Sequence, residues 1–422
     1  MIGRIGVACM LTGLLAACAS QEQPASGTAG ATEPVVAAAP ATPPAAPAKP
    51  PAPPLPDPVP FPNAVENAAT TLFSKAQLTP ERSTGARIPV VIDPLVDGVT
   101  GGTSRSSMAM GDMITDIVAA KFPNFEILPM TPETIQRQPL VLVGTFTGLN
   151  KDLKSVGDRE TFRVCLVLAD LALGKTVGKG VARALPEGID LTPTPYVAQS
   201  PAWRLDPYMD GYIKTCQATK PGDPINPVYL EGVLTASIVS EASAAYDEGR
   251  FSDALELFNN ALLTPAGQQL RVLNGVYMAN WQLGRRDAAA DAFGEIVDYG
   301  LEADKLAVKL LFKQGSTAFW PDPAVSGPYP IWLDTIAQRV ARRNTCLEVT
   351  GHTTKTGAAA FNDRLSELRA ELIKARLESL QPSLQGKILA AGAGSRENII
   401  GTGRDDATDA LDRRVDFKPF AC

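Results

Sequence analysis

A chain of 422 residues with 45% hydrophobic and 20% charged residues has room for two or three globular domains besides any linker. Its formal net charge of −6, without a cluster of basic residues, argues against nucleic acid as a partner. Beyond the N-terminus no segment approaches the roughly 18 consecutive apolar residues of a membrane span, so we expect none.

Residues 1–17 have the pattern of a secretory signal peptide. Arg4 precedes an apolar run, from Ile5 to Leu15, that is too short to span a bilayer. The run ends in Leu15-Ala16-Ala17-Cys18, which resembles the lipobox of bacterial lipoproteins. The resemblance implies that Cys18 becomes the lipidated first residue, carrying palmitate or similar acyl chains, and that Ala19 directs it to the outer membrane. The alternative is a non-lipidated secretory signal with a chance cysteine.

Residues 18–62 follow as a linker composed mainly of proline and alanine. Such a segment buries no core and favours polyproline II at about 3.1 Å per residue, so it reaches on the order of 100 Å. We interpret it as a tether between the membrane and the globular part.

Residues 63–184 are predicted to form a small α/β domain. Helices are expected over 63–76 and 108–121, and strands over 88–92, 140–143 and 162–168. Alternation at Phe162, Val164, Leu166 and Leu168 predicts a half-buried strand, and Asp170 to Lys175 a hairpin turn. The element order resembles periplasmic lipoprotein domains of the curli-secretion and flagellar type.

Residues 185–230, rich in proline and tyrosine, are expected to form an irregular connection, and residues 231–303 to be helical. Gly249, Ala254 and Phe258 recur 35 residues later as Gly284, Ala289 and Phe293. This spacing resembles the tetratricopeptide repeat, whose period is about 34 residues. It implies either a groove for a protein partner or a spacer between domains.

The most specific motif is Gly351-His352-Thr353-Thr354, followed by Asn362-Asp363-Arg364-Leu365-Ser366 and by Arg369-Ala370. It resembles the peptidoglycan-binding motif of OmpA-like domains, Gly-His-Thr-Asp and then Asn-x-x-Leu-Ser-x-x-Arg-Ala. Leu311 to Ser316 resembles the first strand and exit loop of that family, and Asp412-Arg413-Arg414-Val415 its closing Asn-Arg-Arg-Val. The resemblance implies an OmpA-like α/β sandwich over residues 304–422.

Arg369 is the central candidate of this domain. Residues 358–380 have the apolar recurrence of an amphipathic helix, with Phe361 among its apolar positions and Arg369 on one side with Asn362, Leu365 and Ser366. A guanidinium grips a carboxylate with two parallel hydrogen bonds. The resemblance implies that Arg369 holds the free carboxylate of diaminopimelate in peptidoglycan. The candidate binding residues are His352, Thr354, Asn362, Leu365 and Arg369.

Thr354 stands where the family has aspartate, so the acid that would hold the diaminopimelate ammonium is missing. Replacing a charged hydrogen bond with a neutral one weakens binding by roughly 1–2 kcal/mol, unless Asp363 or Asp322 substitutes. The alternative is a decayed copy of the fold that only packs.

Four cysteines remain after Cys9 leaves with the signal and Cys18 takes lipid. In an oxidising compartment an even number favours disulfides, and the preferred pairing is Cys165 with Cys216 and Cys346 with Cys422. Four cysteines allow three connectivities, and free buried thiols are the alternative.

Catalytic chemistry has little support in this sequence. His352 is the single histidine, and no Gly-x-Ser-x-Gly, His-Glu-x-x-His or Cys-x-x-Cys occurs. A catalytic pair of carboxylates that the fold alone brings together remains an alternative. We expect no enzyme, no cofactor and no metal, and two alternative functions. The first is an outer-membrane lipoprotein that tethers the envelope by binding peptidoglycan; the second is an adaptor that recruits an envelope protein complex through residues 63–303.

Overall fold

A computed structural model describes residues 56–83, 87–403 and 408–422, and within these ranges the chain from residue 56 onward forms one compact unit. The predicted signal peptide, Cys18 and most of the proline- and alanine-rich linker lie outside the described residues. None of the described helices has the length and apolar character needed to cross a bilayer. Structured chain begins inside the predicted linker, since Pro58 and Val59 already pair with a sheet.

The first sheet has seven strands in the order β1-β7-β6-β5-β2-β4, with β3 against β5. The strands are β1 (Pro58–Val59), β2 (Ile88–Ile92), β3 (Val96–Asp97), β4 (Phe125–Leu128), β5 (Leu140–Leu149), β6 (Thr161–Asp170) and β7 (Lys175–Ala184). Strands β5, β6 and β7 are antiparallel, whereas β2, β4 and β5 pair in parallel. The expected hairpin joins β6 to β7.

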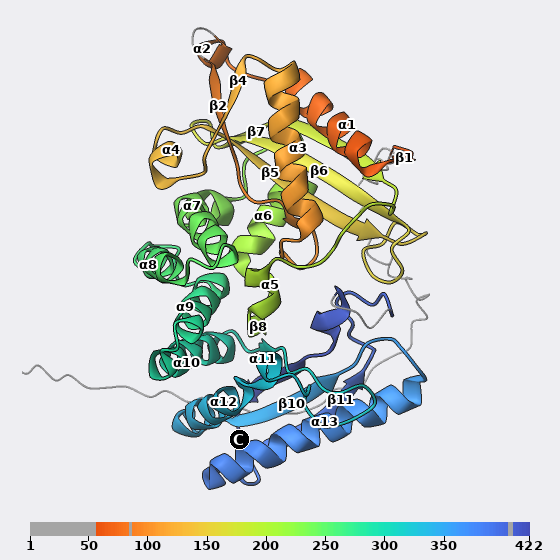
Figure 1. Cartoon of the computed structure of the whole chain (residues 1–422), viewed down its shortest axis with the longest axis vertical. Helices are drawn as coiled ribbons and strands as arrows, with labels where there is room; N and C mark the ends of the chain where they lie inside the picture. Colours follow the sequence, from red (N-terminus) through yellow and green to blue (C-terminus); the bar gives the residue numbers. More distant parts are fainter. Residues whose placement is uncertain (1–55, 84–86, 404–407) are drawn as a thin grey trace, which may run out of the picture. The chain divides into compact units, whose positions relative to one another are not determined.

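Helices cover both faces of this sheet (Figure 1). Helices α1 (Phe61–Ser74) and α3 (Arg105–Lys121) pack with Leu140 and Leu142 on one face. The other face buries Val141 and Val143 against α6 (Pro207–Gln217) and α7 (Pro227–Asp247). The short helices α2 (Pro80–Ser83) and α4 (Pro132–Gln136) lie in the connections. Strand β6 is buried on both sides from Val164 onward, with Leu166 in one core and Val167 in the other, so the prediction of a half-buried strand is wrong.

The stretch expected to be irregular is largely structured. It contains α5 (Pro195–Gln199), β8 (Ala202–Trp203), α6 (Pro207–Gln217) and the start of α7 (Pro227–Asp247). Three of its prolines, Pro195, Pro207 and Pro227, occupy the first position of these helices, where the missing N–H would have no helical partner anyway. Asp206 accepts a hydrogen bond from the Met209 N–H at 2.8 Å and caps α6. Proline at these three positions marks a helix start rather than a loop.

Residues 227–302 form a run of antiparallel helices in which neighbours along the chain pack together. Helices α8 (Phe251–Leu262), α9 (Leu270–Gln282) and α10 (Arg286–Glu302) follow α7. Gly249 and Gly284 have φ of 79° and 73°, and each turns the chain into the second helix of a pair. Phe258 and Phe293 are both fully buried. The 35-residue displacement therefore relates two glycine turns of similar conformation and two buried phenylalanines; the tetratricopeptide assignment itself stays a prediction.

The second sheet has five strands in the order β11-β10-β12-β9-β8. It is built from β8 together with β9 (Leu306–Val308), β10 (Cys346–His352), β11 (Ile388–Gly394) and β12 (Val415–Phe420). Its helical elements are α11 (Pro323–Ser326), α12 (Tyr329–Arg343), α13 (Ala359–Leu380) and the 3₁₀ turns η1 (Pro382–Leu384) and η2 (Thr408–Asp412). Helix α13 packs on β10 and β11, and α12 packs between α13 and α10.

The strand that the OmpA resemblance placed at residues 311–316 lies a few residues upstream. Residues 311–316 are irregular, with a single bridge between Phe312 and Phe319, and the strand is β9 instead. The Leu311 N–H donates to the Tyr329 hydroxyl at 2.9 Å and not to a strand. Apolar residues at 310–312 therefore reflect burial against aromatic side chains.

The two cysteine pairs differ. Cys346 and Cys422 form a disulfide across 76 residues, in the preferred pairing. Cys165 and Cys216 are adjacent but remain free buried thiols, so the preferred second disulfide is not formed in this structure. Each thiol instead donates to the other residue's carbonyl oxygen, at 3.0 and 2.9 Å, which satisfies both groups within the sheet–helix interface.

Candidate functional site

The motif residues meet where β10 ends and α13 begins. Gly351 allows the helix to approach, because a Cβ at this position would lie 2.2 Å from the carbonyl oxygen of Ser366. Ser366 is fully buried, and its hydroxyl accepts the Gly394 N–H at 2.9 Å. The helix is thereby held against the ends of both β10 and β11.

Asn362 organises the loop that follows His352. Its side-chain amide donates to the carbonyl oxygens of Thr354 and Thr356, at 3.3 and 3.0 Å. Thr354 and Leu365 are buried beside it. Phe361, in contrast, is 55% exposed, so its predicted place on the apolar face of the helix is wrong. The first turn of α13 fixes the loop mainly through polar contacts.

Arg369 is only 4% exposed. Its Nε donates to the Ser316 carbonyl oxygen at 3.0 Å and its Nη2 to the Lys313 carbonyl oxygen at 3.3 Å. The guanidinium also lies over the Phe312 ring, 4.7 Å from its centroid. These contacts fix its plane against the 313–316 loop. The structure thus brings Arg369, Asn362 and Thr354 to one end of the sheet.

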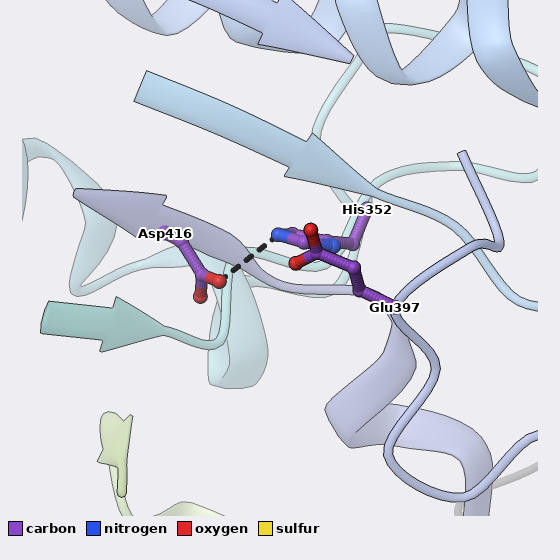
Figure 2. Close-up of side chains that lie close together, drawn as sticks. All are labelled: His352, Glu397 and Asp416. Carbon is purple, nitrogen blue, oxygen red and sulfur yellow. Dashed lines mark ion pairs between the residues drawn. The ribbon is translucent and has the colours of Figure 1, made fainter. Parts of the chain in front are cut away.

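His352 forms a second cluster, shown in Figure 2 with Asp416 and Glu397. It is 2% exposed, and its Nε2 lies 3.0 Å from the Asp416 Oδ2, although the pair lacks hydrogen-bond alignment. A ligand atom from each of the three residues lies within 4.8 Å of the others. His352 therefore faces away from solvent into a charged interior rather than toward the loop surface.

Two cations already surround Asp416. Lys305 Nζ lies 2.7 Å from its Oδ2, and Arg414 Nε donates to its Oδ1 at 3.0 Å. Burial alone would raise the pKa of Asp416, but His352 and Arg414 outweigh it and hold that pKa well below its usual range. An added metal ion would face both cations, so the cluster is better suited to a structural role.

Sequence reasoning missed the part played by Asp412. This fully buried carboxylate accepts the N–H groups of Ile399, Ile400 and Gly401, at 2.6, 3.0 and 2.7 Å. It closes the connection between β11 and β12. An acidic residue at the start of Asp412-Arg413-Arg414 was the only signal, and it does not reveal which backbone groups it would bind.

The two proposed substitutes for the missing aspartate have other partners. Asp363 forms an ion pair with Arg396, and Asp322 accepts the Ala324 N–H at 2.9 Å as the cap of α11. Neither carboxylate is placed here as a direct replacement for the acid at Thr354.

Comparison with known proteins matches residues 311–410 to the OmpA family. This confirms the resemblance for that part of the chain. A search of curated proteins finds no match. The OmpA-like domain has the polar loop, the buried Arg369 and the charged His352 cluster described above.

Solved structures similar to this domain come from several bacteria. An outer membrane protein from Borrelia burgdorferi is 23% identical, covering 27% of this chain and 86% of that one, with a TM-score of 0.21. The peptidoglycan-associated lipoprotein from Burkholderia pseudomallei is 22% identical, covering 26% of this chain and 88% of that one, with a TM-score of 0.23. The cell wall anchor of the type VI secretion system from Pseudomonas aeruginosa is 23% identical, covering 28% of this chain and 81% of that one, with a TM-score of 0.23.

Proposed function

We propose that this protein is an outer-membrane lipoprotein that binds peptidoglycan non-covalently through its OmpA-like domain. The observation that carries the proposal is the meeting of Arg369, Asn362 and Thr354 at one end of β10, inside the segment that matches the OmpA family. A guanidinium fixed in orientation loses little freedom when it binds a carboxylate, which favours a role as a clamp.

The ligand in this proposal is the diaminopimelate of the stem peptide. Its free carboxylate is held by Arg369, with His352, Asn362 and Leu365 supporting the loop and helix around it. Thr354 offers its ammonium a hydroxyl instead of a carboxylate, so binding is weaker by roughly 1–2 kcal/mol than in a domain with the aspartate. The chemistry is binding only, without a catalytic step or a cofactor.

At the other end, Cys18 carries the lipid that anchors the chain in the outer membrane, facing the periplasm. The proline- and alanine-rich segment then spans the distance to the cell wall. Replacement of Cys18 with serine should leave the signal unprocessed and keep the protein out of the outer membrane. Membrane-bound protein of mature size in that variant would refute the anchor.

A sacculus co-sedimentation assay tests the clamp. Arg369→Ala should lower retention on purified sacculi about tenfold or more, because a charged bidentate contact is lost. Arg364→Ala is the matched control, since it removes an exposed arginine from the same helix. Thr354→Asp should tighten retention. Equal retention of Arg369→Ala and the parent, with both proteins folded by circular dichroism, would show that Arg369 does not bind the wall.

A second function is favoured by the antiparallel helices of residues 227–302, in which a glycine turn and a buried phenylalanine recur, and by the sheet that precedes them. In this alternative they recruit an envelope protein complex as an adaptor, and the OmpA-like domain only localises it. Capture of a defined partner by residues 67–303 alone, with wall binding dispensable in cells, would favour the adaptor. Wall retention without a stable partner would favour the tether.

A further inference from the structure

A cavity of about 550 Å³ lies apart from the OmpA motif. Its walls come from the loops around β3, from the segment of α5 and β8, and from α6, α7 and α9. The OmpA-like domain closes the cavity with residues that include Leu311, Trp320 and Ile400. Small-molecule sites have volumes of about 300–1,000 Å³ and occur where several elements meet. The size and position of this cavity are therefore those of a ligand site.

Most of the cavity wall is apolar. Five of the side chains that line it are Val197, Trp203, Met209, Val239 and Leu270. Trp203 is oriented by its indole N–H, which donates to the Thr100 carbonyl oxygen at 3.0 Å, so its ring is held as part of the wall. Such a surface favours the apolar body of a ligand over water.

Three buried polar atoms of the lining have no hydrogen-bond partner among the described residues: Arg159 Nε, Arg271 Nη2 and Asn274 Oδ1. Arg271 is nevertheless rigid, because its Nε donates to Gln269 at 2.7 Å and its guanidinium stacks on Tyr208, 4.2 Å from the ring centroid. Asn274 is 5% exposed and donates to the Ala202 carbonyl oxygen at 2.9 Å. Buried polar atoms are costly without partners, so these three favour a polar ligand group.

The charges of the lining favour an anion. Its acidic side chains are Asp93, Asp97 and Asp206, and its basic ones are Arg159, Arg204, Arg271, Lys309 and Arg413. The acids have partners within the fold: Asp93 accepts the Tyr229 hydroxyl, Asp97 the Val99 and Thr100 N–H groups, and Asp206 the Met209 N–H. Lys309 and Arg204 already donate to backbone carbonyl oxygens. Arg159 and Arg271 each have a buried nitrogen without a hydrogen-bond partner among the described residues, so we assign these two arginines as the donors for a ligand.

We propose that this cavity binds an amphipathic carboxylate. Its apolar body lies against Val239 and Trp203, its carboxylate accepts from Arg159 and Arg271, and an amide N–H or hydroxyl beside the carboxylate donates to Asn274. A simple fatty acid and an N-acyl amino acid share this chemistry. They differ in the group that would satisfy Asn274.

Calorimetric titration of residues 56–422 below the micelle concentration tests the proposal. Dodecanoate should bind, N-dodecanoylglycine should bind more tightly, and acetate and dodecyltrimethylammonium should not. Equal binding of dodecanoate and N-dodecanoylglycine assigns the ligand to the simple fatty-acid class. Binding of the cationic amphiphile as tightly as dodecanoate would overturn the proposal, because it would show adsorption without recognition of charge.

Single-residue variants distinguish the loss of a charged contact from the loss of cavity volume. Arg159→Gln and Arg271→Gln should each weaken dodecanoate binding about tenfold. Ser240→Phe, at a lining position, should block binding by filling the cavity without removing charge. Arg137→Gln, an exposed arginine outside the lining, is the matched control. If Arg271→Gln fails to fold, the other two variants decide. Unchanged affinity in both would exclude this cavity as the site.

Discussion

The two sheets of this protein bury their residues in different ways. In the first sheet the central strands β5 and β6 have apolar side chains on both faces, and helices complete two apolar cores. In the second, the strand ends carry buried polar groups: His352 and Arg414 lie against Asp416, and Asp412 accepts backbone N–H groups. Both sheets bury an apolar core, which in the second includes Leu347, Val349 and Phe417. The second sheet adds buried charges and a covalent link at its strand ends, so the two regions should respond differently to reduction and to pH.

The largest effect is expected from the disulfide of the second sheet. Replacing Cys346 and Cys422 together with alanine opens a loop of 76 residues and should lower the free energy of unfolding by about 4–5 kcal/mol, from chain entropy alone. Urea unfolding of residues 56–422 measures it, and reductant should reproduce it in the parent. A loss below about 1 kcal/mol would show that the contacts of β12 hold the chain end without the bond.

Asp416→Asn should cost about 3 kcal/mol at pH 7, because it leaves Arg414 buried without its counter-charge. The pKa of Asp416 is depressed in the folded protein, so its contribution is present above the ordinary aspartate value of about 4 and is lost as pH falls below it. The difference between variant and parent should therefore shrink under acid. A difference that stays constant down to pH 2 would contradict this assignment.

Asp93 in the first sheet should behave in the opposite way. Burial raises its pKa to about 6, against the attraction of Arg271 and the hydrogen bond from Tyr229. The folded state thus holds this proton more tightly, and stability should fall by about 2–3 kcal/mol as pH rises from 4 to 7. Asp93→Asn should remove this slope in urea unfolding at several pH values. An unchanged slope would assign it to another group.

The smallest effect is expected at the free thiols. Cys216→Ala should cost about 1 kcal/mol, because it removes a small buried group without opening a covalent loop. Alkylation of denatured, unreduced residues 56–422 should label two cysteines, since the other two are bonded. Labelling of none would mean that Cys165 and Cys216 also form a disulfide, and the contrast between the sheets would then disappear.

The sequence predicted the repetitive parts of both regions well. Strand β2 was placed over Ile88–Ile92 because β-branched residues fill it, and α13 over nearly its full length because its apolar spacing is helical. Strand β5 was predicted too short, because alternation is lost when both faces are buried. The prolines of residues 185–230 were read as loop signals, although three of them begin helices.

The sequence predicted which residues form the candidate site better than it predicted how they are arranged. Motif positions placed Arg369, Asn362 and Thr354 together, and the structure brings them together through backbone carbonyls that carry no sequence signal. The partners of His352 come from β12 and from the loop after β11, so its burial against Asp416 depends on tertiary contacts. Long-range polar pairing of this kind is determined by the fold and not by local spacing.

Strand β8 has a practical consequence for anyone who isolates the OmpA-like domain. It contributes only Ala202 and Trp203, but it covers the outer side of β9, whose Ala307 and Val308 pair with it. A fragment that starts near residue 304 would expose the unpaired backbone groups of β9 to solvent. Uncovered strands of this kind recruit other chains, so such a fragment should self-associate where the longer protein does not.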